Sequence, residues 1–326
     1  MAGDASNESE PVSAEKPARL HASVPLRRWW FVVVVLVAVL ELVLHLVQSR
    51  DVIEDADWAA VKSTVETQTQ PEDLVVVSPR WVDPLGRMQL GDALMTTRRV
   101  ARADESRFPK ATEVALGGAH SGALESWTVE GETDIGPFVV RRLVNPAYRP
   151  IVDDLVAHAQ SSKLDVSKVG ASSHPCTWRK GASATGALGF GPAAPAERFH
   201  CDRGAWVAET IVADLDYAPR RCIYAPPPGG NDVLRLRFHE VKFGKRLEGH
   251  HALYVEAERD QKGSPIRISF SSGGNTLGEA RHEDGQGWVE FAFDTPALAG
   301  TTAELIAEIS SKNGSRRMYC FEATTR

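Results

Sequence analysis

Hydrophobic positions cluster most densely near the start of the chain. The segment WWFVVVVLVAVLELVLHLV fills residues 29–47, and only Glu41 and His45 interrupt it. An α-helix rises about 1.5 Å per residue, so this run reaches about 28 Å, close to the hydrocarbon thickness of a bilayer. Because VVVVLVAVL has no polar stripe, a helix buried in a globular core is disfavoured. The pattern predicts a single transmembrane helix over residues 29–48.

The charges around this run predict its orientation. Basic residues precede it and mostly acidic residues follow it: Lys16, Arg19, Arg27 and Arg28 before, and Arg50, Asp51, Glu54, Asp55 and Asp57 after. Positive charge prefers the cytoplasmic side, so a disordered N-terminal tail (residues 1–28) is expected in the cytoplasm and the rest outside it, which is the periplasm if the cell is a Gram-negative bacterium. A cleaved signal peptide is the alternative, although the tail is long for one and no A-x-A sequence follows.

Glu41 and His45 are four positions apart and share one face of the predicted helix. A carboxylate inside a membrane is unfavourable and often marks function. One interpretation is a neutral Glu41 near the interface, bonded to His45 or to water. The other is a contact with a partner membrane protein, for which these two residues are the candidate site.

Helix and strand signals alternate through residues 52–165, which are predicted to form a small α/β domain. After Asp57, the segment WAAVKSTVETQT places Trp58, Val61 and Val65 on one face of a helix. The apolar run LVVV between turn residues predicts a buried strand. ATEVALGG is a further strand, SWTVEG and FVVRRLVNP are a candidate hairpin, and IVDDLVAHAQ is a candidate short helix.

Residues 166–204 are dense in Gly, Pro and Ala and are predicted to form a loop. GALGFG in this loop has neither a strand before it nor a helix after it, so it is not interpreted as a phosphate-binding loop.

Four cysteines, Cys176, Cys201, Cys222 and Cys320, all follow the predicted span. An even number outside the cytoplasm predicts two disulfides. Three pairings are open, and we favour Cys176–Cys201 and Cys222–Cys320, which close the loop and join the two ends of the C-terminal domain. A zinc site is the alternative, but Cys-x-x-Cys and His-x-x-x-His spacings are missing, so no metal is predicted.

Hydrophobic and polar residues alternate with a period of two through residues 205–326. In DVLRLRFHEV, for example, Leu234, Leu236 and Phe238 alternate with polar residues, and HHALYVEAERD and PIRISFSSGG repeat the pattern. This alternation predicts strands with one face in a core, and GG, DG and NG turns separate several of them. About eight antiparallel strands are expected, which predicts a jelly-roll-like β-sandwich and an α+β fold class.

Two stretches resemble known families. The LRLRF strand, the HEDGQGWVEFAFDTPALAG segment and the closing YCFEA strand resemble the galactose-binding-like jelly-roll family in their order. That resemblance implies a domain that binds carbohydrate or packs against partner domains, and no run of oxygen ligands assigns the structural calcium common in the family. Residues 58–81 resemble the soluble segment that follows the membrane part of lipid-linked-sugar glycosyltransferases. This resemblance implies an extracytoplasmic α/β unit and not transferase activity, because the many spans of those enzymes are missing.

The candidate ligand-binding residues are aromatic. Trp206, Tyr254 and Trp288 could stack on sugar rings, and a core or edge role is the alternative. Four histidines are interpreted as surface or turn residues, since neighbours on a strand face opposite ways: His239, His250, His251 and His282. Glu283 and Asp284 lie in a Gly turn and are interpreted as part of a hairpin rather than as paired catalytic carboxylates.

Composition narrows the function without naming a reaction. With 43% hydrophobic residues, 25% charged residues and a net charge of −6, the chain is an ordinary globular protein that lacks the basic balance of a nucleic-acid binder. No cofactor is predicted. The expected function is a membrane-anchored extracytoplasmic binding or scaffolding module, for a glycan or a partner membrane protein. The alternative is a membrane-tethered enzyme acting on envelope polysaccharide.

Overall fold

The computed structural model describes residues 30–48, 53–160, 162–183 and 191–326. They fall into two compact units, the first ending at Glu54 and the second covering Asp55–Arg326. The predicted cytoplasmic tail, residues 1–28, lies outside the described residues.

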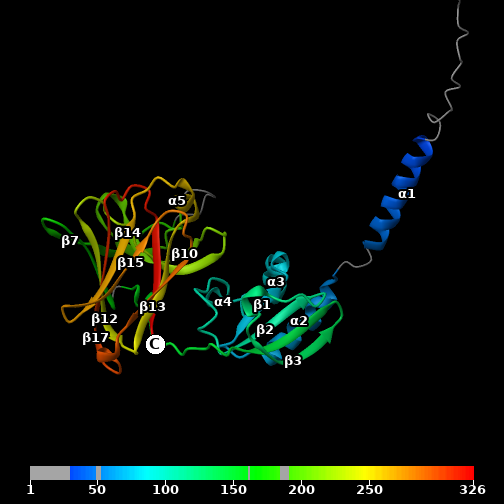
Figure 1. Cartoon of the computed structure of the whole chain (residues 1–326), viewed down its shortest axis with the longest axis horizontal. Coiled ribbons are helices and arrows are strands. Elements are labelled where there is room, and N and C mark those ends of the chain that lie inside the picture. The colour runs from blue at the N-terminus through cyan, green and yellow to red at the C-terminus, as the bar shows by residue number, and fades with distance from the viewer. Residues whose placement is uncertain (1–29, 49–52, 161, 184–190) are drawn as a thin grey trace, which may run out of the picture. The chain divides into compact units, whose positions relative to one another are not determined.

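The apolar run forms helix α1, Trp30–Gln48, which confirms the predicted helix (Figure 1). Its side chains from Trp30 to Leu46 are exposed, Glu41 and His45 among them. In the portions of the chain with described positions, no helix is both long and apolar enough to cross a membrane. The membrane crossing of residues 29–48 is therefore not confirmed and stays a prediction.

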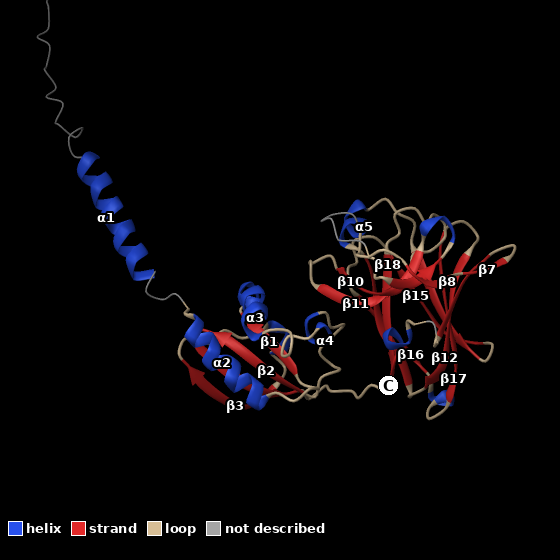
Figure 2. Cartoon of the chain, turned by 180° about the vertical axis from the view of Figure 1, so that it is seen from behind, coloured by secondary structure: helices blue, strands red, loops and turns tan. Residues whose placement is uncertain are grey.

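Residues from Asp55 to about 150 form the predicted α/β domain, built on one mixed sheet with the strand order β1-β2-β4-β3. Strands β1 and β2 are parallel, and β3 and β4 form the predicted antiparallel hairpin. The strands are β1 Leu74–Ser78, β2 Lys110–Leu116, β3 Thr128–Ile135 and β4 Phe138–Val144, and the helices are α2 Asp55–Gln68, α3 Asp83–Leu90 and α4 Thr97–Val100. Figure 2 shows α2 lying along the sheet.

The α/β domain packs as its hydrophobic pattern predicts. Trp58, Val61 and Val65 of α2 are buried, and the Trp58 ring lies 4.5 Å from the ring of Phe138 on β4. All five residues of β1 are buried. Helix α3 approaches β1 closely, since a Cβ atom on Gly86 would lie 2.6 Å from a methyl carbon of Val77.

The rest of the chain forms a β-sandwich of two antiparallel sheets, with the strand orders β16-β13-β18-β11-β10-β9-β8 and β15-β14-β17-β12-β6-β7. In the first sheet the strands are β8 Thr177–Lys180, β9 Glu197–His200, β10 Trp206–Ala213, β11 Pro219–Tyr224, β13 Arg246–Leu253, β16 Val289–Asp294 and β18 Tyr319–Thr325, with β5 Asp153–Asp154 beside β18. In the second they are β6 Leu164–Val169, β7 Ser173–Pro175, β12 Val233–Lys242, β14 Ile266–Ser272, β15 Asn275–His282 and β17 Thr302–Ser311.

Side chains from both sheets interdigitate in one core. The ring of Phe270 on β14 lies 5.3 Å from that of Phe291 on β16 and 6.2 Å from that of Phe321 on β18. Both favoured disulfides are present, Cys176–Cys201 and Cys222–Cys320. The predicted β-sandwich, the α+β class and the disulfide pairing are thus confirmed.

The sandwich begins earlier in the chain than the predicted residue 205. The boundary predicted at residue 165 falls inside β6, whose Leu164 and Val166 are buried in the sandwich core. The stretch 166–204, predicted as a loop, contains β7, β8 and β9, while residues 184–190 lie outside the described part. In LDVSKV (residues 164–169), apolar and polar residues alternate, which is a strand signal. The Gly/Pro-rich composition of the residues that follow favoured the prediction of a loop instead.

Two local predictions need correction. Of residues 151–160, predicted as a short helix, only Leu155–His158 are helical, as a four-residue 3₁₀ helix, and Asp153–Asp154 form strand β5. The strand predicted through HHALYVEAERD ends at Leu253, and Val255–Asp260 form helix α5. Glu, Ala and Arg favour helix over strand. In addition, the buried Glu258 carboxylate accepts hydrogen bonds from the backbone N–H groups of Leu253 and Gly285, which fixes helix α5 against the end of β13.

Candidate functional site

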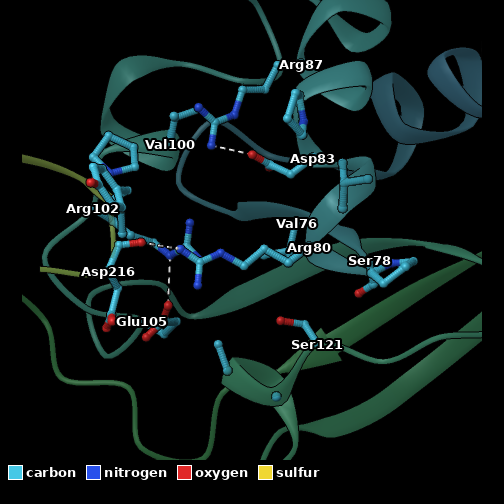
Figure 3. A pocket seen from close by; sticks show the side chains of 18 of the residues that line it. Val76, Ser78, Arg80, Asp83, Arg87, Val100, Arg102, Glu105, Ser121 and Asp216 are labelled. Atoms are coloured by element: carbon cyan, nitrogen blue, oxygen red, sulfur yellow. Dashed lines mark hydrogen bonds and ion pairs between the residues drawn. The ribbon is translucent and has the colours of Figure 1, made fainter. Parts of the chain in front are cut away.

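A cavity of about 670 Å³ lies where the α/β domain meets a loop of the sandwich (Figure 3). Its lining comes from the end of β1 and the start of α3 (76–87), from segments 100–105 and 120–123, and from the sandwich loop 216–220. In α/β sheets, ligands bind beyond the carboxyl ends of parallel strands. Because β1 and β2 are the parallel pair here, the cavity occupies the position where such a sheet binds a ligand.

A buried carboxylate organises the wall of this cavity at the ends of β1 and β2. Glu113 of β2 accepts hydrogen bonds from the Ser78 hydroxyl at 2.6 Å and from the backbone N–H of Ser121 at 2.6 Å. Its second oxygen lies 2.7 Å from Nδ1 of His120 and 3.1 Å from Arg141. The loop 120–123 is therefore held against the end of β1 by one side chain.

Burial acts to raise the pKa of Glu113, but the hydrogen bonds from Ser78, His120, Ser121 and Arg141 outweigh it and lower the pKa below its ordinary value of 4.5. A carboxylate with a lowered pKa is a poor general base. Although serine, carboxylate and histidine meet here, the carboxylate stands between the other two. The arrangement positions the cavity wall and does not resemble an activated serine nucleophile.

Charged side chains of both signs line the cavity. Four are arginines and three are carboxylates: Arg80, Arg87, Arg102 and Arg220, and Asp83, Glu105 and Asp216. Arg87 pairs with Asp83 along α3, and the Arg102 Nε atom lies 2.9 Å from Glu105. The cavity therefore offers both hydrogen-bond donors and acceptors.

The sandwich contributes one aromatic ring, Tyr217, and one hydrogen-bonded arginine, Arg220, to the lining of the cavity. Tyr217 is 61% exposed, and the guanidinium of Arg259 lies 4.5 Å from its ring centre. Arg220 donates to Asp214 at 2.8 Å and to the carbonyl oxygen of Ala103 in the α/β domain at 3.1 Å. These bonds hold the sandwich side of the cavity against the linker that precedes β2.

The three aromatic residues predicted as ligand-binding lie elsewhere or in supporting positions. All three pack around a small cluster that contains the Cys222–Cys320 disulfide. The Trp206 ring packs on Tyr224 with ring centres 4.2 Å apart and the planes tilted by 35°. Trp288 lies under Arg220 at 5.5 Å, and its Nε1–H donates to the carbonyl oxygen of Ala103 at 3.0 Å. Each is half-buried, Tyr254 included, and none lines the cavity. Ligand binding by these three residues stays a prediction.

The histidines are mostly not surface residues. His250, His251 and His282 are buried, and only the half-buried His239 fits the prediction. His282 contacts Glu258 at 2.6 Å, and His251 contacts the Tyr319 hydroxyl at 2.8 Å, so buried polar partners explain their place on the core side. Across the residues given positions, no group of three or more His, Cys, Asp or Glu side chains could hold a metal ion.

Sequence reasoning missed every residue that lines the cavity. One signal was available: Glu113 interrupts the apolar strand ATEVAL, and a carboxylate inside a buried strand needs partners. Ser78 and Arg80 directly follow the buried strand LVVV, where an α/β sheet places its ligand. The contribution of residues 216–220 had no local signal.

At the level of sequence, no family and no curated protein matches the chain. Among solved structures it is similar to the CBM51-2 and INT domains of ZmpB from Clostridium perfringens, in complex with GlcNAc (7% identity, TM-score 0.28, 61% of this chain and 40% of that chain) and without it (9%, 0.29, 61% and 40%). It is also similar to the K2 cleaved adhesin domain of Lys-gingipain (14%, 0.20, 39% and 75%).

The chain spans 40% of the length of these ZmpB chains. Because all three TM-scores lie below 0.5, the likeness does not establish a shared fold, and the β-sandwich is established by strand pairing alone. The narrower galactose-binding-like jelly roll and the glycosyltransferase resemblance stay predictions.

Proposed function

We propose that this protein is a membrane-anchored, extracytoplasmic module that binds a glycan in the cavity between its α/β domain and its β-sandwich. The single observation that carries the proposal is the composition of that cavity. Sugars present hydroxyl groups that donate and accept hydrogen bonds and C–H faces that pack on aromatic rings. The lining matches both needs.

The donors, acceptors and ring come from different parts of the chain. Arg80 and Arg102 supply planar donors, and Asp216 and Glu105 supply acceptors. Tyr217 supplies a ring that is mostly open to solvent. A volume of about 670 Å³ falls in the range of small-molecule binding sites.

Binding is favoured over catalysis by the state of the acidic residues. A glycosidase needs two carboxyl groups facing each other across the sugar, one of them acting as an acid. Of the three carboxylates in the described lining, Asp83 and Glu105 are each engaged by an arginine, which leaves Asp216 without a second carboxylate to act with it. The membrane-tethered enzyme is retained as an outcome of the test.

The test is a glycan array on the full chain, with the bound glycans then incubated with the protein and scored for cleavage. We expect binding without cleavage. Tyr217→Ala should lower affinity by about five-fold or more, because it removes a stacking ring worth about 1 kcal/mol. The matched control, Trp206→Ala, removes a ring outside the cavity lining and should leave affinity unchanged.

If Trp206→Ala lowers the affinity and Tyr217→Ala does not, the glycan binds on the sandwich surface predicted from the sequence and not in the cavity. Cleavage of a bound glycan would show that the protein is an enzyme and not only a binding module. If no glycan on the array binds, glycan binding is refuted and a partner protein becomes the proposed ligand.

The anchoring part of the proposal is supported by the apolar, exposed helix α1 and by two disulfides in the second unit, which require an oxidising compartment. Val37→Arg places a charge in the middle of α1, which disfavours insertion by about 3 kcal/mol. We expect this variant to leave the membrane fraction, whereas Glu41→Leu should remain there. Recovery of the unaltered chain in the soluble fraction would refute the anchor.

Glu41 and His45 remain the proposed docking point for a membrane partner. Glu41→Leu keeps the helix apolar and removes the carboxylate. The set of membrane proteins that co-purifies with the chain should then shrink. If it is unchanged, the docking role is withdrawn and the anchor stands.

A further inference from the structure

We infer that the cavity selects saccharides that carry an anionic group, a carboxylate or a phosphate, and that Arg80 binds this group. The inference rests on the proposed binding of a saccharide in the same cavity, and it adds the charge class of the ligand.

Most of the charges around the cavity cancel in ion pairs. The lining holds four arginines and three carboxylates, and Asp214, which lies outside the lining, pairs with Arg220. Charges in a partly enclosed cavity act at a lower effective dielectric constant than charges on the open surface, so the nearest groups dominate. Recognition of a charged ligand therefore depends on the groups left outside these pairs, Arg80 and Asp216.

Arg80 differs from the other three arginines in its partners. Each of the others is neutralised by a carboxylate, in the pairs Arg87–Asp83, Arg102–Glu105 and Arg220–Asp214. For Arg80, the described residues provide one hydrogen-bond partner, the carbonyl oxygen of Asp216 at 3.1 Å. A guanidinium has five N–H donors, so most of the donors of Arg80 are available to a ligand.

The place of Arg80 suits a ligand that spans the two domains. It lies in the turn Arg80–Val82 directly after β1, and its hydrogen bond reaches the sandwich loop. Figure 3 shows its side chain extending through the cavity toward Asp216, with Ser121 pointing into the same space. An anion held bidentately by the free edge of this guanidinium would leave the attached sugar within the lining of serines and carboxylates.

The test is calorimetric titration of the full chain, purified in a mild detergent, with four probes: methyl glucoside, glucuronic acid, glucose 6-phosphate and inorganic phosphate. We expect at least one anionic sugar to bind ten-fold or more tightly than methyl glucoside. The glucuronic acid and glucose 6-phosphate arms show whether carboxylate or phosphate is preferred. Inorganic phosphate should bind more weakly than the better anionic sugar.

Variants assign the effect to Arg80. Arg80→Gln should lower the affinity for the anionic sugars by ten-fold or more and leave that for methyl glucoside unchanged. Arg80→Lys should lie between the two, because an ammonium keeps the charge and loses the bidentate fork. Arg98→Gln, which removes an exposed arginine of α4 outside the cavity lining, is the matched control and should have no effect. Melting temperatures within about 2 °C of the parent show that each variant is folded.

The outcomes separate the inference from the proposed function. If methyl glucoside binds as tightly as the anionic sugars, or if Arg80→Gln leaves their ratio unchanged, the inference is overturned and glycan binding stands. Inorganic phosphate binding as tightly as glucose 6-phosphate would support the anionic site and overturn saccharide recognition. Binding of none of the four probes overturns the inference together with its saccharide basis.

Discussion

The α/β domain and the β-sandwich bury polar groups in different ways. In the α/β domain, Glu113 is fully buried, yet its partners Ser78, His120 and Ser121 open onto a cavity. In the sandwich, Glu258 and His282 are also fully buried and contact each other, but none of the described partners of Glu258 lines the cavity. A buried charge therefore points to a site only when its hydrogen bonds lead to the lining of an accessible space.

Covalent cross-links also separate the two regions. Both disulfides lie in the sandwich, and the described residues of the α/β domain include no cysteine. The sandwich is thus the stabilised frame, and the α/β domain supplies most of the cavity lining.

Removing the long-range disulfide should have the largest effect. Cys222→Ala with Cys320→Ala opens a link between residues 98 positions apart and should lower the free energy of unfolding by about 4–5 kcal/mol. Opening Cys176–Cys201, with a separation of 25, should lower it by about 3 kcal/mol. Denaturant titration measures both. If opening either disulfide lowers the free energy of unfolding by the same amount, the length of the closed loop does not determine the size of the effect.

Loss of the Glu113 charge should destabilise the α/β domain by about 2–3 kcal/mol, because Glu113→Gln replaces one accepting oxygen by an NH₂ group, so buried donors lose their acceptor. Arg141 keeps its ion pair with Glu132 at 2.7 Å. The pKa of Glu113 is lowered on folding, so its contribution is present above the unfolded value of 4.5 and is lost as pH falls below it. Unfolding at pH 7 and at pH 3 should therefore differ less in the variant than in the parent.

The sandwich should respond to acid in a different window. Burial, with smaller effects of His282 and His250, lowers the pKa of His251 from 6.5 to about 3. The unfolded chain binds this proton first, so stability should fall as pH decreases from 6.5 toward 3, by up to about 1.4 kcal/mol per pH unit. In His251→Phe the slope between pH 6.5 and 5 should shrink. An unchanged slope would mean that other groups cause it.

The smallest effect concerns the contact between the two regions. Trp288→Phe keeps a ring under Arg220 but removes the Nε1–H donor to the Ala103 carbonyl oxygen. The loss of one hydrogen bond should lower the free energy of unfolding by about 1 kcal/mol. Hydrogen exchange in segment 100–107 should increase at the same time. Protection of that segment at the parent level would show that Arg220 holds the linker alone.

Much of the fold could be predicted because it depends on neighbours in the chain. The burial of Trp58, Val61 and Val65 follows from helical spacing, and the buried strand β1 follows from an apolar run between turns. The β3–β4 hairpin is similarly local. Helix α5 was missed because an alternating pattern six residues long fits either structure, and the buried Glu258 contacts that select the helix come from the tertiary fold.

The apolar helix α1, the order of an α/β domain before a β-sandwich, and the presence of two disulfides could be predicted from the chain alone. Each of these follows from periodicity or from counting along the chain, whereas the choice among three cysteine pairings is settled by the fold. The location of the candidate ligand site also depends on the fold, because Arg80 meets the carbonyl of Asp216 from a position 136 residues away. Such a contact is set by how two domains pack, and nothing in the local pattern around either residue encodes it.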